Sequence, residues 1–282
     1  MNPLVIDTHQ HLWDPGVFRY SWMDGFPALG QKAMLEEYQQ AAAGLNIDQT
    51  VYVDTDVDEY DMGRELQTIL ALSDNPLSGI AGVVAGAKLE KEDPFVHFGS
   101  LAGHRKLKGV RRVLQAQPDD LSRQLQFVEN VRSLSSRQWS FDLCVLARQL
   151  LLARELVGKC PDVSFILDHC GCPDVKAGTL DPWRDDLREL SLLPNVACKV
   201  SGLVAYADPK SWSAEDLKPF FKHVVACFGW DRLMWGGDWP VCKLTASLKE
   251  WLEAAVVLTA DASEEQSLGF FAGNARRIYR LG

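Results

Sequence analysis

The stretch Val5-Ile6-Asp7-Thr8-His9-Gln10-His11, near the start of the chain, decides the fold. Residues 4–6 are apolar and mostly β-branched, which predicts a short buried strand. The strand then becomes polar and ends in two histidines. Because residues i and i+2 of an extended segment point to the same face, His9 and His11 share a face. Two imidazoles side by side can hold a divalent metal ion, although a polar strand end without metal has the same pattern.

The length and charge of the chain limit the classes of protein that it can belong to. The 282 residues are 47% hydrophobic, enough for one domain spanning residues 1–282 with a large core. The formal net charge is −9 and there is no basic run, which argues against nucleic acid and anionic membrane surfaces as partners. No apolar run is long enough to cross a bilayer. We therefore expect a small-molecule partner, and homo-oligomer formation stays open.

The cysteines and the N-terminus indicate a cellular compartment. Seven cysteines are scattered along the chain, an odd number that does not fit a disulfide framework. Met1-Asn2-Pro3 leads directly into the first strand, without a secretory or transit segment. Reduced thiols in a cytoplasmic protein are the simplest interpretation.

Strand-like and helix-like segments alternate along the whole chain. The predicted strands cover residues 4–6, 50–53, 80–85, 108–114, 139–144, 163–169, 195–200 and 232–236. The predicted helices cover residues 31–45, 62–72, 90–101, 121–134, 146–157, 183–192, 214–228, 244–258 and 264–281, with Ser263 and Gln266 spaced as a capping box. Such alternation favours parallel βαβ units and an α/β fold, here a single-domain (β/α)₈ TIM barrel. An open doubly wound sheet is the alternative, but the first β–α turn lacks a Gly-x-Gly-x-x-Gly loop.

Ionisable residues gather at the carboxyl ends of the predicted strands. In chain order they are His9, His11, Arg111, His169, Lys199 and Asp238. In a TIM barrel all of these ends meet at one mouth, where active sites form. This convergence is more specific than the His-x-His pair alone.

Several motifs resemble those of one enzyme superfamily. They are Asp7-Thr8-His9-Gln10-His11-Leu12-Trp13-Asp14-Pro15, Gly109-Val110-Arg111, Leu167-Asp168-His169-Cys170-Gly171, Lys199-Val200-Ser201-Gly202-Leu203, Gly237-Asp238-Trp239-Pro240 and Asn274-Ala275-Arg276. The series resembles the amidohydrolase superfamily, above all its branch of small lactone-hydrolysing barrels such as L-fuconolactonase, L-rhamnonolactonase and 2-pyrone-4,6-dicarboxylate lactonase. The motifs occur in order from the first strand to the last helix, so the resemblance covers essentially the whole chain.

The resemblance implies a metal site and an acid–base group. His9, His11, His169 and Asp238 fall on positions that bind metal and transfer protons. A divalent ion, for which zinc suits imidazole ligands, would lower the pKa of bound water and polarise the lactone carbonyl. Asp238 would act as the general base, and His169 would be either a ligand or the group that polarises the carbonyl. Because no lysine ends the fourth strand to bridge two metals, we expect one ion or none.

The substrate-binding residues follow from charge and aromatic character. Arg111, Arg112 and Lys199 are candidates for binding substrate hydroxyls, a carboxylate or a developing oxyanion. Trp22 and Trp239 are candidates for an aromatic wall, with burial in the core as the alternative.

Three further features at these strand ends bear on the substrate. Arg112 and Cys172 depart from the family pattern, which often has histidine and lysine at these positions. The acidic run at residues 54–59 is expected to be a solvated loop, unless Asp54 or Asp56 reaches the mouth.

The leading hypothesis is a carboxylic ester hydrolase that opens a sugar lactone, such as L-fuconolactone or L-rhamnonolactone, to the free acid through an activated water. One alternative is a lactonase without metal that binds an anionic, pyrone dicarboxylate-like lactone through Arg111 and Arg112. Another is a metal-dependent decarboxylase of the same superfamily. A barrel without catalysis is disfavoured because a scaffold has no chemical need for His9, His11, His169 and Asp238 together.

Overall fold

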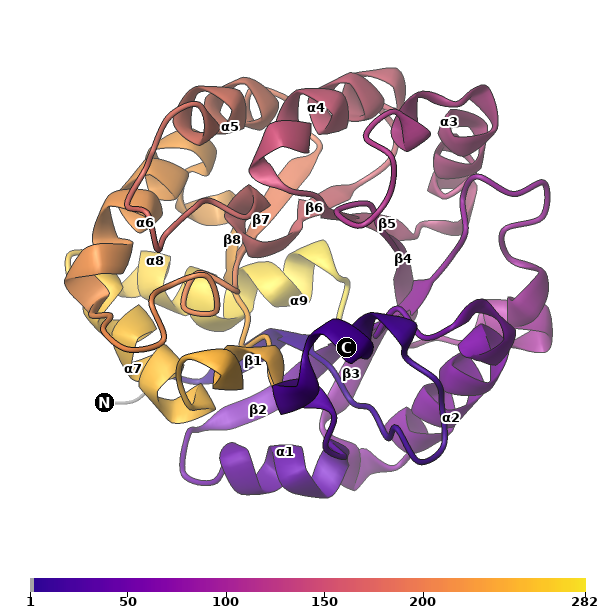
Figure 1. The fold of residues 1–282 in the computed structure, drawn as a ribbon, viewed down its shortest axis with the longest axis horizontal. Helices are drawn as coiled ribbons and strands as arrows, with labels where there is room; N and C mark the ends of the chain where they lie inside the picture. The colour runs from indigo at the N-terminus through magenta and orange to yellow at the C-terminus, as the bar shows by residue number, and fades with distance from the viewer. Residues whose placement is uncertain (1–2) are drawn as a thin grey trace.

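The computed structural model describes residues 3–282, and eight parallel strands in these residues form one sheet in the order β1 to β8 (Figure 1). The strands are β1 (Val5–Gln10), β2 (Ile47–Val53), β3 (Ile80–Gly86), β4 (Leu107–Val113), β5 (Ser140–Cys144), β6 (Phe165–Leu167), β7 (Val196–Val200) and β8 (Leu233–Trp235). Each strand pairs with the next one along the chain. The predicted (β/α)₈ barrel is confirmed.

The barrel closes at the segment that carries the histidine pair. Gln10 bridges Trp239 in parallel, and the His11 amide donates to the Trp239 carbonyl at 2.9 Å. The Asp238 amide donates to the His9 carbonyl at 2.8 Å. The hydrogen bonds that join the two ends of the sheet therefore also place Asp238 beside His9 and His11.

The helices surround the strands, as Figure 1 shows. They are α1 (Leu35–Ala41), α2 (Met62–Asp74), α3 (Leu125–Arg132), α4 (Leu150–Lys159), α5 (Trp183–Ser191), α6 (Ala214–Phe228), α7 (Leu248–Leu258), α8 (Glu264–Leu268) and α9 (Asn274–Ile278). The capping box predicted for α8 is present: the Ser263 amide donates to Gln266 Oε1 at 2.9 Å, and the Gln266 amide donates to Ser263 Oγ at 3.2 Å.

The C-terminal segment closes the amino-terminal end of the barrel. The interior-facing strand residues pack with Ala272, Ala275 and Tyr279 into one buried cluster, and α9 lies across the barrel centre in Figure 1. The Tyr279 hydroxyl donates to Asp142 Oδ2 at 2.6 Å inside the barrel. The opposite, carboxyl end of the strands is thereby left as the open mouth.

Two of the predicted helices differ from the structure. Residues 90–101 do not form an α-helix; a 3₁₀ segment, Val96–Gly103, is interrupted at Gly99, whose φ of 49° only glycine adopts readily. Residues 264–281 do not form one uniform helix, because the π-helical turn Gly269–Gly273 separates α8 from α9. Phe270 and Phe271, which belong to this turn, are both buried in the core.

Within residues 3–282 no helix is both long and apolar enough to cross a membrane. Met1 and Asn2, on which the expectation about the N-terminal segment partly depends, lie outside the described residues.

The Tyr279 hydrogen bond inside the barrel predicts a measurable contribution to stability. Tyr279→Phe should lower the free energy of unfolding by about 2 kcal/mol, because it removes a buried hydrogen bond to a carboxylate. The measurement is urea unfolding followed by circular dichroism. Tyr60→Phe is the matched control, because Tyr60 is 73% exposed and should change stability by less than about 0.5 kcal/mol. Equal midpoints for the two variants would contradict this role of Tyr279.

Candidate active site

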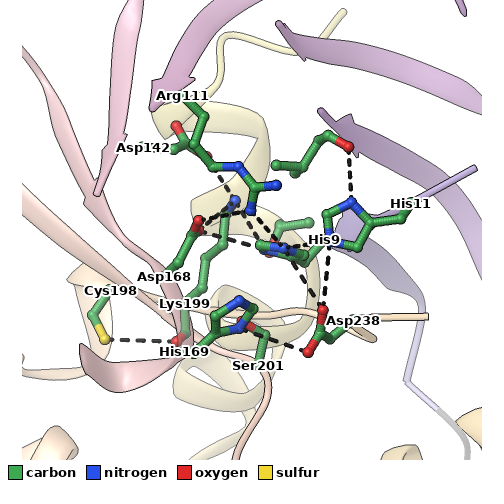
Figure 2. Close-up of polar contacts among 12 residues, drawn as sticks. His9, His11, Arg111, Asp142, Asp168, His169, Cys198, Lys199, Ser201 and Asp238 are labelled. Carbon is green, nitrogen blue, oxygen red and sulfur yellow. Dashed lines mark hydrogen bonds and ion pairs between the residues drawn. The ribbon is translucent and has the colours of Figure 1, made fainter. Parts of the chain in front are cut away.

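The histidine pair at the end of β1 presents two ring nitrogens to each other. His9 Nε2 and His11 Nε2 lie 3.1 Å apart (Figure 2). His11 Nδ1 is 2.9 Å from the Val53 carbonyl oxygen, which can only accept, so Nδ1 carries the hydrogen and Nε2 holds a lone pair. His9 Nδ1 is 3.4 Å from Asp168 Oδ1. Lys199 Nζ, which can only donate, lies 3.3 Å from the same Nδ1 atom. In the tautomer in which His9 Nδ1 donates to Asp168, both Nε2 lone pairs face the same point, as in a metal site whose ligands are oriented from behind.

Asp238 supplies an oxygen to that point. Its Oδ1 lies 3.6 Å from His11 Nε2 and 3.8 Å from His9 Nε2, and it is buried with no hydrogen-bond partner among the described residues. Burial raises the pKa of Asp238 to about 6. Its φ of 54° is unusual for a residue other than glycine. An unpaired buried carboxylate oxygen held in a strained backbone is a feature of functional sites.

The donor atoms of His9, His11 and Asp238 form a group that could hold a metal ion. Two neutral imidazoles and a carboxylate with an open position match the ligand preferences of a catalytic zinc site. His169 does not belong to this group; with His9 and Asp168 it forms a second one. In that second group Lys199 Nζ lies 3.1 Å from Asp168 Oδ1 and 3.3 Å from His9 Nδ1. Lys199 already pairs with the carboxylate of the second group, whereas the ionic contacts of the Asp238 carboxylate within residues 3–282 are with histidines, so the first group fits a metal better.

Two buried cations, Arg111 and Lys199, lie beside the histidines and are paired with buried carboxylates; Figure 2 shows Asp142 and Asp168 among them. Arg111 Nε contacts Asp54 Oδ1 at 2.6 Å, and Arg111 Nη1 contacts Asp168 Oδ2 at 3.3 Å. Lys199 Nζ contacts Asp142 Oδ2 at 2.7 Å as well as Asp168.

The imidazoles are neutral at physiological pH. Burial, followed by the charge of Arg111, lowers the pKa of His11 to about 3. Burial and the charge of Lys199 hold the pKa of His9 well below its usual value. Burial alone would raise the pKa of Asp168, but Lys199, His9 and Arg111 hold it well below its usual value. Neutral histidines are the form that binds a metal ion.

His169 is held by the turn that follows β6. Its φ is 53°, and its Nδ1 lies 2.9 Å from Ser201 Oγ and 3.8 Å from Asp238 Oδ2. Gly202 makes room for the ring, because a Cβ atom there would come within 2.7 Å of His169 Nδ1. Burial lowers the pKa of His169.

A cavity of about 420 Å³ opens onto this centre. His11, Arg111, His169 and Asp238 line it, as does Trp22. His9 lies behind them, with no exposed surface. The predicted metal and catalytic residues are therefore brought together at the barrel mouth, with His9 in the layer beneath.

Three of the predicted substrate-binding residues lie away from the cavity. Lys199 is fully buried beneath it, among carboxylates. Arg112 follows Arg111 in β4 and points to the other face of the strand, where its Nη2 pairs with Glu90 at 2.7 Å. Trp239 is buried with its ring 5.4 Å from that of Tyr38. Cys172 is also buried and donates its thiol hydrogen to the Tyr206 hydroxyl at 3.2 Å.

The sequence did not single out two acidic residues of the site, Asp142 and Asp168. The expectation of a solvated loop is wrong for Asp54, which is buried and paired with Arg111. The alternative that this acidic run reaches the mouth is confirmed for Asp56, which lines the cavity. Asp142 in β5 and Asp168, directly after β6, balance Lys199. Their signal in the sequence is a carboxylate at or near the end of an otherwise apolar strand, where a buried charge requires a partner.

Comparison with known proteins assigns the family. A family model described as amidohydrolase matches residues 6–281, and the chain belongs to this family. An L-fucono-1,5-lactonase of Burkholderia multivorans is 30% identical over 304 residues, covering 100% of this chain and 97% of the relative. A 4-sulfomuconolactone hydrolase of Rhizobium radiobacter is 27% identical, covering 83% of this chain and 75% of the relative.

Solved structures agree with this assignment. A crystal structure of an amidohydrolase from Burkholderia multivorans with bound zinc has a TM-score of 0.87 and 29% identity, covering 99% of this chain and 100% of that chain. An amidohydrolase from Bifidobacterium longum, at 24% identity and a TM-score of 0.75, shares the fold.

The buried position of Lys199 predicts a structural role. Lys199→Met should cost about 3–5 kcal/mol of unfolding free energy, because Asp142 and Asp168 lose a buried counter-ion. Lys249→Met is the matched control, since the Lys249 side chain is 65% exposed and should have little effect. Urea unfolding measures both variants. A Lys199→Met protein as stable as the control would contradict the charge balance described above.

Proposed function

We propose that this protein hydrolyses a lactone and that His9, His11 and Asp238 hold one divalent ion, zinc, for the reaction. The observation that carries the proposal is the unpaired Asp238 Oδ1 within 3.8 Å of two imidazole nitrogens at the mouth of a TIM barrel. The names of the relatives support lactone hydrolysis, and the zinc in a similar solved structure supports the choice of metal.

Hydrolysis of a lactone requires a nucleophilic water, a polarised carbonyl and a proton for the departing ring oxygen. When bound, the ion would act as a Lewis acid and lower the pKa of water. Asp238 takes the proton of the attacking water while the new C–O bond forms at the carbonyl carbon. The ring C–O bond then breaks, its electron pair stays on the departing oxygen, and Asp238 returns the proton to that oxygen.

One cavity residue is placed to assist at the carbonyl. The His169 ring is fixed by Ser201 and by the nearby Asp238, so it is positioned to hydrogen-bond a substrate oxygen. The Arg111 guanidinium also lines the cavity, but its charge is already balanced by Asp54 and Asp168. Trp22 contributes an apolar wall next to them.

For the substrate we propose a five- or six-membered aldonolactone. The relatives named L-fucono-1,5-lactonase and L-rhamnono-gamma-lactonase support a sugar lactone. The alternative of an anionic lactone bound by two arginines receives no support from the geometry, because Arg112 points away from the cavity to Glu90.

The proposed base predicts the effect of one isosteric change. Asp238→Asn cannot accept a proton, so hydrolysis of an aldonolactone panel, followed with a pH indicator, should slow by about 10²–10⁴-fold. Asp261→Asn, at an exposed position, is the control and should keep the wild-type rate. The mechanism is wrong if Asp238→Asn retains the rate of the control.

The proposed ligands predict that zinc stabilises the fold. We expect zinc to bind only the folded state. Zinc at a concentration 100 times the dissociation constant of the zinc complex should therefore raise the free energy of unfolding of chelator-treated wild type by about 2.7 kcal/mol. His11→Ala should lose this response. His104→Ala removes a histidine that contacts Asp74, away from the cavity, and should keep it. Thermal unfolding measures all three proteins, and an equal response of the two variants would exclude His11 as a ligand.

A further inference from the structure

The cavity has an apolar wall built by two loops. The loop after β1 contributes Trp13, Trp22, Phe26 and Leu29, and the segment after β8 contributes Val241 and Leu244. These two loops contact each other. The Trp22 indole N–H is already used, because it donates to the Thr55 carbonyl at 2.8 Å. This wall therefore offers hydrocarbon and aromatic surface to a substrate, with little capacity for hydrogen bonding.

The ends of β2 and β4 contribute a different kind of surface. Gln115 lines the cavity, and its Oε1 is buried without a hydrogen-bond partner among the described residues. Asp56 also lines the cavity. Within residues 3–282 its carboxylate accepts no hydrogen bond, and its nearest ionic contact is Arg112 Nη1 at 4.0 Å. The neighbouring Thr55 hydroxyl is committed to Glu65. Gln115 Oε1 and the Asp56 carboxylate are therefore hydrogen-bond acceptors of the cavity lining without a donor among the described residues.

The cavity offers no free positive charge to an anionic group. Arg111 is the cationic side chain in its lining, and its guanidinium already contacts Asp54 at 2.6 Å and Asp168 at 3.3 Å. A substrate carboxylate would have to compete with these two buried partners. It would also approach the Asp56 carboxylate, and like charges at close range repel. The charges of the lining therefore favour an uncharged substrate.

We infer that Gln115 and Asp56 are specificity-determining residues, which accept hydrogen bonds from hydroxyl groups of an uncharged lactone, and that Asp56 excludes lactones carrying a carboxylate. The apolar wall takes the hydrocarbon face of the same substrate. The inference rests on the proposed lactonase function and adds which part of the substrate is recognised and by which side chains. Sites built to hydrogen-bond a hydroxyl reject analogues that lack it, because buried acceptors are then left unpaired.

The experiment compares kcat/KM for three lactones of equal ring size: an aldonolactone, its analogue without the ring hydroxyls, and an aldarolactone that carries a carboxylate. The wild type should prefer the aldonolactone over both by at least about 10-fold. Gln115→Leu should reduce the preference over the analogue without hydroxyls by about 10-fold. Asp56→Asn should raise the rate on the aldarolactone, relative to the aldonolactone, by about 10-fold.

Two exposed positions provide matched controls, Gln40→Leu and Asp93→Asn, which should keep the wild-type preferences. Gln115→Asn is a second variant at the first position, for use if Gln115→Leu does not fold by circular dichroism. If the wild type hydrolyses lactones but the cavity variants keep the preferences of the controls, the inference is overturned. A wild type that prefers the aldarolactone also overturns it. If the wild type opens none of the three lactones, the proposed function itself fails.

Discussion

The carboxylate of Asp168 is shared by the two buried cations of the barrel, Lys199 at 3.1 Å and Arg111 at 3.3 Å. Each cation has a second acidic partner, Asp142 for Lys199 and Asp54 for Arg111. Charges removed from water are tolerated only when they are paired, so none of these side chains can be lost alone without leaving an uncompensated ion. This network joins β4, β5, β6 and β7 beneath the mouth and positions His9 through its Nδ1 atom.

The network also separates the roles of the two aspartates nearest the histidines. Asp168 is held ionised by its cations and, together with Lys199, faces His9 Nδ1. Asp238 is left with an unpaired oxygen facing His9 Nε2 and His11 Nε2. Asp238 can therefore bind a metal ion or accept a proton without breaking the ion pairs of Asp168 with Lys199 and Arg111. The positive φ angles of His169 and Asp238 are the backbone strain that this arrangement requires.

Much of this site could be predicted from the sequence, because parallel strands bring their carboxyl ends to one mouth. That rule placed His11, His169, Arg111 and Asp238 correctly at the cavity. It did not say which face each residue takes: neighbouring residues of a strand point to opposite sides, so Arg112 could not join Arg111.

The remaining differences depend on partners and on local backbone geometry. The burial of Asp54 and Lys199 depends on partners from other strands, which spacing along the chain does not reveal. The helix at 214–228 was predicted at its observed bounds, whereas the segment around Gly99 and the π-helical turn depend on local backbone geometry.

The central claim is that one ion, bound by His9, His11 and Asp238, supports lactone hydrolysis, and titration of chelator-treated protein with zinc tests it most directly. The account predicts that the rate rises linearly and stops at one equivalent per chain. A rate that is unchanged by removing and restoring zinc, or that stops rising only at two equivalents, would contradict it.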